Sequence, residues 1–384
     1  MSKARRKLKA FAAGMLIMLL VSFSSNVIYA EPALADGAKS VILIEAATGK
    51  VLYENNPDER LPPASVTKIM TLLLTIEAVD NGTIKLEDKV QVSTNAASMG
   101  GSQVFLEPGE EMTVDELLKC VAVASANDAA VALAEYVAGS EEGFVDKMNE
   151  RAKQLGMDNT HFENATGLDD TVTDHLTTAR DIAIMSKELM SHEKILDYTT
   201  IWMDSIRNGA FGLTNTNRLI RFYRGANGLK TGSTSKALYC ISAAAKRDGM
   251  QLIAVIMGAP TRDVRNEIAK KLLDYGFANY KYVGYEASNL KKLPVIGGTA
   301  DEIMLKKGGF DAVLSKSAGK IEERVTLPEK LAAPVNEGDT VGTVEYLCDG
   351  EVISKVEIVA SETVERIGYF ELLSRFLRRF FLCG

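Results

Sequence analysis

The chain has 384 residues, of which 46% are hydrophobic and 25% charged, so it is long enough for two globular domains with substantial cores. Its net charge of −7 argues against nucleic-acid binding, and it has no phosphate-binding glycine motif of the Walker or dinucleotide type. Its three histidines do not cluster with cysteine or aspartate at metal-ligand spacing, so we predict no metal. We also predict no organic cofactor.

Residues 1–35 have the pattern of a secretory signal peptide. Five basic residues precede an apolar run from Ala10 to Val21, which is too short to span a bilayer comfortably. Ala33-Leu34-Ala35 fits a small-x-small cleavage site, Ala30 is a second candidate site, and an uncleaved anchor is the alternative. In either case we expect the rest of the chain to be exported to the outer face of the cytoplasmic membrane, where it is extracellular or periplasmic according to the host.

The first candidate site follows a predicted hairpin of residues 40–45 and 51–53. Pro62 and Pro63 suit the start of a helix, and an apolar helical stretch follows from Ile69, so Ser65 and Lys68 fall one turn apart near a helix N-terminus. A serine hydroxyl needs a nearby base to become a nucleophile, and a lysine held as the neutral amine can serve. The motif alone is weak, since an ordinary helix start would look the same.

The second candidate site is Ser125-Ala126-Asn127. A helix is predicted to open at Thr113 with Glu116 as a capping box and to run toward Ser125, which places this segment at a junction between two helices. There Ser125 would relay a proton, and Asn127 would hold Lys68 or a substrate amide. The alternative is ordinary N-capping of the next helix, and both roles are compatible.

The third candidate site is the run Lys230-Thr231-Gly232. Residues 237–245 and 251–257 form a predicted hairpin, which places this run on a strand that borders a cleft. Glycine at 232 would let a substrate backbone approach closely. Lys230 would attract a substrate carboxylate and lower the pKa of Lys68, while Thr231 would donate a hydrogen bond. A surface turn that happens to contain a lysine is the alternative.

The order Ser-x-x-Lys, Ser-x-Asn, Lys-Thr-Gly is the signature of penicillin-recognising serine enzymes. Together with Lys-Thr-Gly-Ser-Thr and residues 257–261, it resembles the low-molecular-mass D-alanyl-D-alanine carboxypeptidases from about Ala38 to the C-terminus. The resemblance implies an α/β (α+β) fold with an antiparallel sheet, helices on both sides and an all-helical subdomain. It also implies an oxyanion hole made by the backbone N–H groups of Ser65 and Ser233, and a basic residue, Arg265, near the site.

Several other residues could carry chemistry, but each has a simpler interpretation. Glu163 lies where a class A β-lactamase places its water-activating glutamate, yet the Glu-x-x-Leu-Asn pattern is missing, which favours a solvated loop carboxylate. We interpret His175 as a loop residue and Trp202 as core or cleft wall. The cysteines are far apart in the sequence and form no C-x-x-C pair, so buried free thiols are expected at Cys120, Cys240, Cys348 and Cys383; a disulfide in an exported protein is the alternative.

The C-terminal part of the chain has a different sequence pattern. After a catalytic domain at 36–285, residues 286–364 contain short alternating strands and the turn Asp349-Gly350, which predict a small all-β, sandwich-like domain. Such a domain is a stalk in the family. Residues 365–384 contain an amphipathic helix from Tyr369 to Phe381, with aromatic and leucine side chains on one face and arginines on the other, as suits an anionic membrane surface. A helix packed on the β domain is the alternative.

The resemblance implies a serine D-Ala-D-Ala carboxypeptidase that removes the terminal D-alanine from peptidoglycan stem pentapeptides through an acyl-enzyme on Ser65. β-Lactams would inhibit it by mimicking that substrate. The alternatives are a β-lactamase, a DD-endopeptidase or transpeptidase, and a silent penicillin-binding or wall-binding module. The expected partners are therefore the stem peptide, β-lactams and, through the C-terminal helix, a membrane surface, with no nucleic acid.

Overall fold

The structure is a computed structural model that describes residues 34–382. Most of the predicted signal peptide therefore lies outside the described residues, as do Cys383 and Gly384. None of the described helices combines the length and the apolarity needed to cross a membrane.

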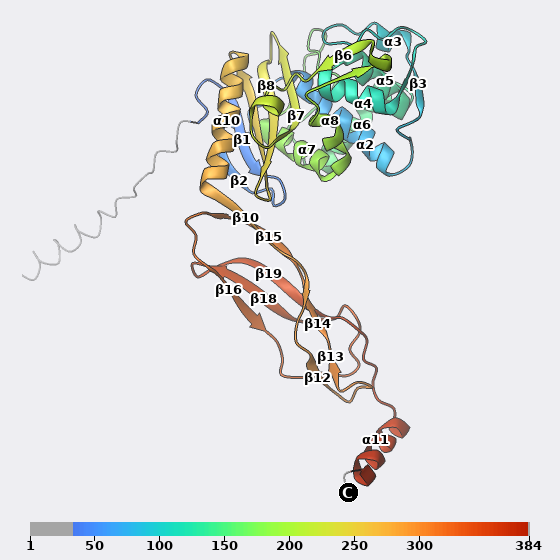
Figure 1. Ribbon diagram of the computed structural model, residues 1–384, viewed down its shortest axis with the longest axis vertical. Coiled ribbons are helices and arrows are strands. Elements are labelled where there is room, and N and C mark those ends of the chain that lie inside the picture. The colour runs from blue at the N-terminus through green and yellow to red at the C-terminus, as the bar shows by residue number, and fades with distance from the viewer. Residues whose placement is uncertain (1–33, 383–384) are drawn as a thin grey trace, which may run out of the picture. The chain divides into compact units, whose positions relative to one another are not determined.

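A five-stranded antiparallel sheet forms the centre of the N-terminal region (Figure 1). Its order is β2-β1-β9-β8-β7, with strands at Val51–Asn55, Ser40–Glu45, Met250–Ala259, Leu238–Arg247 and Ala226–Thr234. Helix α10 (Arg262–Asn279) covers one face, and α2 (Lys68–Asp80) and α7 (Ala179–Ser191) cover the other. The apolar strand β9 is almost wholly buried between these layers, whereas β7 is an edge strand.

A mainly helical region lies between β2 and β7 in the chain. Besides α2 and α7, its helices are α3 (Thr94–Ala97), α4 (Val114–Lys119), α5 (Asn127–Ala138), α6 (Glu141–Gln154), α8 (Leu196–Thr199) and α9 (Leu219–Phe222). Two short hairpins accompany them: β3 (Lys89–Gln91) with β4 (Glu111–Thr113), and β5 (Met203–Ile206) with β6 (Phe211–Thr214). The predicted capping box is confirmed, since Thr113 and Glu116 satisfy each other's backbone N–H groups at the start of α4.

The C-terminal region is all-β, as predicted. One sheet has the order β11-β14-β19-β18-β16, with strands at Ser288–Asn289, Leu305–Lys307, Glu351–Ala360, Thr340–Cys348 and Ile321–Thr326. A second has the order β13-β12-β17, with strands at Glu302–Ile303, Leu293–Ile296 and Leu331–Ala332. β10 (Tyr280–Tyr285) pairs with β15 (Phe310–Ser315). The predicted turn at Asp349-Gly350 joins β18 to β19, and both turn residues have positive φ, of 53° and 84°.

The predicted C-terminal helix is present as α11 (Tyr369–Leu382). Arg375 connects it to the all-β region by a 3.1 Å ion pair with Asp301 and by hydrogen bonds to the carbonyl groups of Gly298 and Thr299. Its large apolar side chains are nevertheless exposed, Phe370 to 83% of its surface, and they also include Tyr369, Leu372, Leu373, Phe376, Leu377 and Phe381.

The cysteines that fall within the described residues are buried free thiols, as predicted, at Cys120, Cys240 and Cys348. Burial raises the pKa of the Cys120 thiol to about 12 and that of the Cys240 thiol to about 11. Both groups are therefore protonated and unreactive at neutral pH.

Candidate active site

The nucleophile candidate lies in a single 3-10 turn, Ala64–Thr67, immediately before α2. Ala64 has the left-handed φ of 48°, which directs the chain out of the two prolines and into this turn. Ser65 Oγ lies 3.0 Å from Nζ of Lys68, the first residue of α2. The predicted pairing of Ser65 and Lys68 across one turn is thus present, with the serine in the 3-10 turn and the lysine at the helix start.

Lys68 is fully buried. Its Nζ lies 2.6 Å from Asn127 Oδ1 and 2.7 Å from the carbonyl oxygen of Thr166, besides the contact to Ser65. Burial, and next the positive charge of Lys230, hold the pKa of Lys68 well below its usual value, while Asp128 acts in the opposite direction. A neutral amine has two N–H donors, which suit the two carbonyl-type oxygens, and its lone pair is then left to accept the Ser65 proton.

The second motif lies where two helices meet. A π-helical turn at Cys120–Ala124 ends α4, and Ser125 follows with the left-handed φ of 63°. Asn127 begins α5, but its side chain caps nothing, because Nδ2 donates to the Gly100 carbonyl at 2.6 Å while Oδ1 faces Lys68. The functional interpretation of this motif therefore fits the geometry better than the capping alternative does.

Strand β7 carries the third motif to the edge of the cavity. Lys230 Nζ donates to Ser125 Oγ at 2.8 Å, and burial, followed by the charge of Arg265, lowers the pKa of Lys230 to about 7. Thr231 Oγ1 donates to Thr216 Oγ1 at 2.8 Å. At Gly232 an added Cβ would lie 2.8 Å from the Ser65 backbone nitrogen. Only glycine therefore lets the strand approach the 3-10 turn that carries Ser65, here called the nucleophile turn, this closely.

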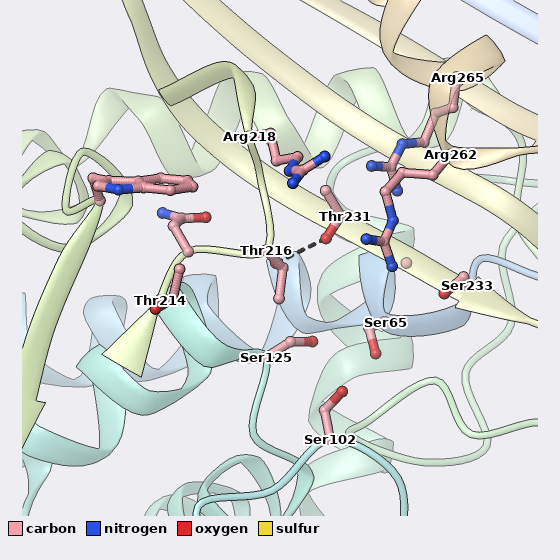
Figure 2. Close-up of a pocket in the computed structure, with 13 residues that line it drawn as sticks. Ser65, Ser102, Ser125, Thr214, Thr216, Arg218, Thr231, Ser233, Arg262 and Arg265 are labelled. Carbon is pink, nitrogen blue, oxygen red and sulfur yellow. Dashed lines mark hydrogen bonds between the residues drawn. The ribbon is translucent and has the colours of Figure 1, made fainter. Parts of the chain in front are cut away.

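These groups border a cavity of about 370 Å³ (Figure 2). Ser65, Ser125, Thr231, Gly232 and Ser233 line it, and the exposed Ser233 follows Gly232 on β7. Lys68, Asn127 and Lys230 lie behind this lining and reach it through their hydrogen bonds. The structure thus brings all the residues of the three sequence motifs together at one place.

Arginines contribute a positive rim that the motifs did not reveal. Arg218, Arg262 and Arg265 line the cavity, and Figure 2 shows them on the side of Thr231 and Ser233. Only Arg265 was anticipated; burial, and next the neighbouring Arg262, lower its pKa to about 10. The described residues that line this cavity include no carboxylate, so it suits an anionic group. Arg218 and Arg262 lie in polar stretches of sequence without a motif, and only their charge could have suggested them.

Two residues that the sequence placed in a loop, Glu163 and His175, hold that loop together through hydrogen bonds. Glu163 Oε2 accepts the backbone N–H groups of Thr173 and Asp174, at 3.1 and 2.8 Å, and so closes its own loop. His175 is buried, and its Nδ1 accepts the Glu163 N–H at 2.9 Å, so Nε2 carries the proton and donates to Thr67 Oγ1 at 2.8 Å. Burial lowers the pKa of His175 to about 4. His175 is a loop residue, as interpreted, but it also supports the nucleophile turn.

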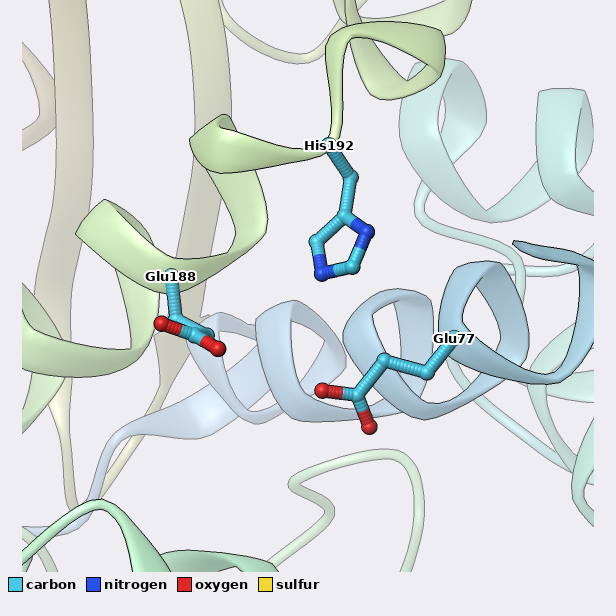
Figure 3. Close-up of side chains that lie close together, drawn as sticks. All are labelled: Glu77, Glu188 and His192. Carbon is cyan, nitrogen blue, oxygen red and sulfur yellow. The ribbon is translucent and has the colours of Figure 1, made fainter. Parts of the chain in front are cut away.

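The described residues bring three metal-type ligands together at one further place, Glu77, Glu188 and His192 (Figure 3). Arg151 already bridges the two carboxylates, with contacts of 2.6 Å to each. His192 Nδ1 is directed to Asp80, 2.6 Å away. The guanidinium occupies both carboxylates and offsets part of their charge, so this group is an ion-pair network that joins α2, α6 and α7.

A serine that lines a polar cavity, a buried lysine of lowered pKa beside it and a lysine-threonine-glycine edge strand define a serine acyl-enzyme hydrolase of the penicillin-recognising type. Residues 27–261 match the family model described as D-alanyl-D-alanine carboxypeptidase, and residues 285–366 match that described as penicillin-binding protein 5, C-terminal domain. The chain belongs to the D-alanyl-D-alanine carboxypeptidase family, and it is a serine peptidase of that activity.

Individual relatives agree with this assignment. The chain is 46% identical to the D-alanyl-D-alanine carboxypeptidase DacF of Bacillus subtilis over 350 residues, which cover 89% of this chain and 90% of the relative. It is similar to the crystal structure of penicillin-binding protein 5 from Haemophilus influenzae, with a TM-score of 0.75, 31% identity, and coverage of 86% and 98%. Penicillin-binding protein D2 of Listeria monocytogenes in its ampicillin-bound form aligns with a TM-score of 0.59 and 32% identity over 64% of this chain and all of that one.

Proposed function

We propose that Ser65 is the residue acylated by the substrate and that Lys68 is its base. The observation that carries this proposal is the contact set of Lys68, whose two carbonyl-type neighbours leave the lone pair of a neutral amine to Ser65 Oγ. Ser65 Oγ attacks the carbonyl carbon between the two terminal D-alanines as its proton passes to Lys68 Nζ. An ester on Ser65 and a free D-alanine result, and water then hydrolyses the ester.

Ser125 and Lys230 act on the leaving group. The nitrogen of the departing D-alanine needs a proton, and Ser125 lines the cavity with its Oγ held by Lys230 at 2.8 Å. Lys230 donates to that oxygen, so the Ser125 hydroxyl proton is free to be passed on. Asn127 fixes Lys68 through Oδ1 and is itself held by the Gly100 carbonyl through Nδ2.

Strand β7 positions the substrate peptide along its edge. The backbone N–H groups of Ser65 and Ser233 form the oxyanion hole, where they stabilise the charge of the tetrahedral intermediate. Thr231 and the arginine rim receive the terminal carboxylate, which fits a cavity lined by three arginines and no carboxylate among the described residues. A bulky side chain at position 232 would close this edge, as the contacts of Gly232 indicate.

A β-lactam would acylate the same serine, and the resulting ester would be hydrolysed slowly. Glu163, the residue closest in sequence to a β-lactamase's water-activating glutamate, is engaged by two backbone N–H groups of its own loop. This observation favours slow hydrolysis of the penicilloyl ester over β-lactamase turnover. The ampicillin-bound state of the Listeria relative supports the same expectation for this chain.

The direct test is release of D-alanine from diacetyl-L-lysyl-D-alanyl-D-alanine, together with intact-mass detection of a penicillin adduct. We expect the wild type to do both and Ser65→Ala to do neither. Ser235→Ala is the matched control, because Ser235 is exposed and is not among the residues that line the cavity. An adduct without peptide hydrolysis would instead indicate a binding module or a cross-linked substrate, and fast penicillin turnover would indicate a β-lactamase.

We further propose that the mature protein is exported and lies against a membrane through α11. We divide the chain into a signal peptide at 1–35, a catalytic domain at 36–285, an all-β domain at 286–364 and a C-terminal anchor at 365–384. The exposed aromatic face of α11 supports the anchor, since a contiguous apolar surface of this kind usually contacts a partner or a membrane.

Sedimentation of the full chain with vesicles that contain anionic lipid tests the anchor. We expect Phe370→Asp combined with Leu377→Asp to abolish co-sedimentation while D-alanine release from a soluble peptide stays the same. Glu322→Gln, on the exposed strand β16, is the control that should sediment like the wild type. Equal sedimentation of all three proteins would contradict a role for α11.

A further inference from the structure

The loop between α3 and β4 connects the active-site cavity to an exposed aromatic ring. Ser102 of this loop lines the cavity, and its carbonyl group accepts the backbone N–H of Asn127 at 2.7 Å. Further along, the buried carboxylate of Asp128 accepts the N–H groups of Val104 and Leu106, at 3.0 and 3.1 Å. The loop is therefore held in place by the second sequence motif and by the residue that follows it.

Phe105 in this loop has a strained conformation. Its φ of 56° lies in the left-handed region, which is an outlier for a bulky side chain. Val104 and Leu106 on either side are buried, whereas Phe105 is 63% exposed. Arg207 holds this conformation by donating to the carbonyl groups of Val104 and Phe105, at 2.9 and 3.0 Å. Because backbone strain persists only where the surrounding structure enforces it, and is concentrated at functional sites, this ring is a candidate for binding.

The ring of Phe105 pairs with a second ring from the hairpin β5–β6. Phe105 and Phe211 contact each other edge to face, with centroids 6.2 Å apart, and the Arg207 guanidinium lies 5.7 Å from the Phe211 centroid. Arg207 also forms an ion pair with Glu110 at 2.7 Å, so its charge is balanced. We call Phe105 and Phe211 the aromatic platform. Its surface is apolar, and the ion pair beside it carries no net charge.

The aromatic platform is continuous with the wall of the active-site cavity. Phe211 begins β6, and Thr214, which ends the same strand, lines the cavity. Trp202, which precedes β5, lines it as well and is therefore part of the cleft wall. Three residues of strand span about 10 Å, and the loop from Ser102 to Phe105 spans no more than that. The platform thus lies close to the cavity at two points of its wall.

The direction of the substrate connects the platform with the part of the substrate that precedes the scissile bond. In the proposed mechanism the terminal carboxylate meets the arginine rim, and Figure 2 shows Ser102 on the other side of Ser65 from that rim. The stem residues before the attacked carbonyl group therefore extend past Ser102. About four residues, or about 14 Å of extended peptide, separate that carbonyl from the sugar to which the stem is attached. The sugar and its neighbours along the glycan chain consequently fall in the region of the platform.

We infer that the aromatic platform is a subsite for the glycan chain that carries the stem peptide. The C–H groups on one face of a pyranose ring are apolar and pack on aromatic rings, and a neutral N-acetyl sugar suits a surface without net charge. A protein partner fits less well, because two phenylalanine side chains offer only about 400 Å², whereas a stable protein interface needs about 800 Å² on each partner. This inference rests on the proposed roles of Ser65 and the arginine rim.

The test compares D-alanine release from a free stem pentapeptide and from the same pentapeptide attached to an N-acetylglucosaminyl-N-acetylmuramic acid disaccharide. We expect the wild type to cleave the disaccharide-linked substrate with a kcat/KM about fivefold to tenfold higher, as one aromatic contact provides. Phe105→Gly should lose most of that advantage and change kcat/KM for the free pentapeptide less than twofold. Glycine adopts a left-handed φ without strain, so this variant removes the ring and keeps the backbone conformation.

Two further variants separate sugar binding from support of the loop. Phe105→Trp keeps an aromatic ring and should retain the advantage of the disaccharide-linked substrate. Phe222→Ala removes a similarly exposed ring, 65% against 63%, that belongs neither to the cavity lining nor to the platform, and it should leave the ratio of the two substrates unchanged.

The possible outcomes are distinct. A wild type without the advantage, or an equal loss on both substrates in Phe105→Gly, overturns the subsite. An advantage that survives in Phe105→Gly places the sugar elsewhere and assigns the ring to another partner, such as a protein, which overturns the subsite too. Failure of the wild type on both substrates would instead contradict the carboxypeptidase mechanism.

Discussion

Gly167 offers a sharp test of how the loop at 162–178 supports the nucleophile. A Cβ added to Gly167 would lie 2.7 Å from Thr67 Oγ1 and closer still to the carbonyl group of Ala64, the residue before Ser65. The next residue toward the N-terminus, Thr166, supplies the carbonyl that Lys68 contacts at 2.7 Å. Gly167→Ala should therefore separate the loop from the nucleophile turn and disturb Lys68 at the same time.

The expected loss of rate in Gly167→Ala follows from how far the added Cβ overlaps its neighbours. Non-bonded contacts need about 3.5 Å, so either the loop or the turn must move by more than 1 Å, about 1.5 Å at the Ala64 carbonyl. A misplacement of about 1 Å can cost about 100-fold in rate. We expect the rate of acylation by benzylpenicillin, followed by intact mass, to fall about 100-fold in Gly167→Ala, with D-alanine release falling in parallel.

Gly156→Ala is the matched control for this prediction. Gly156 has a φ of 74°, similar to the 84° of Gly167, but a Cβ there meets no atom within 4 Å. Both variants place alanine in the left-handed region, at about 1 kcal/mol each, but only Gly167→Ala adds the collision. Equal acylation rates in two variants that both remain folded at the assay temperature would refute the proposed support.

Two other predictions concern the protonation of Lys68 and the stability of α4. If Lys68 is the base, as proposed, it must be neutral, and activity should be lost as pH falls through its pKa. Asp128→Asn removes a charge that raises this pKa and should move the acid limb of kcat/KM to lower pH, whereas Lys230→Gln should move that limb to higher pH. Shifts of equal sign would contradict this assignment. Thr113→Ala removes the capping box with Glu116 and should lower the free energy of unfolding by about 1 kcal/mol in chemical denaturation, leaving kcat/KM within twofold; unchanged stability would argue against the cap.

The sequence predicted those parts of the site that short patterns encode. Ser65 and Lys68 are one turn apart, and Lys230 to Ser233 share a strand, so local spacing already places them relative to one another. The same holds for the turn at Asp349-Gly350, where two consecutive residues of positive φ connect the strands. Local chemistry was sufficient because each of these features depends on neighbours in the chain.

Other parts of the site depend on contacts between distant segments. Lys68 is held by the carbonyl oxygen of Thr166, and Asn127 by that of Gly100, and a backbone atom leaves no side-chain signature in the sequence. Arg218 and Arg262 reach the cavity from separate elements, so only the fold brings them together. The pairing of β10 with β15 likewise joins segments that alternating patterns alone did not match.

The two buried lysines explain why the proposed proton transfer runs in one direction. Burial lowers the pKa of each, and next the charge of Lys230 lowers that of Lys68, while the charge of Arg265 lowers that of Lys230. In the proposed mechanism, when Lys68 accepts the Ser65 proton while Lys230 is charged, two buried cations coexist until one proton leaves. In that mechanism the Ser125 hydroxyl, which accepts a hydrogen bond from Lys230, passes its proton to the nitrogen of the leaving residue. In the proposed mechanism, the burial and the Lys230 charge that lower the pKa of Lys68 therefore also favour protonation of the leaving group once acylation has begun.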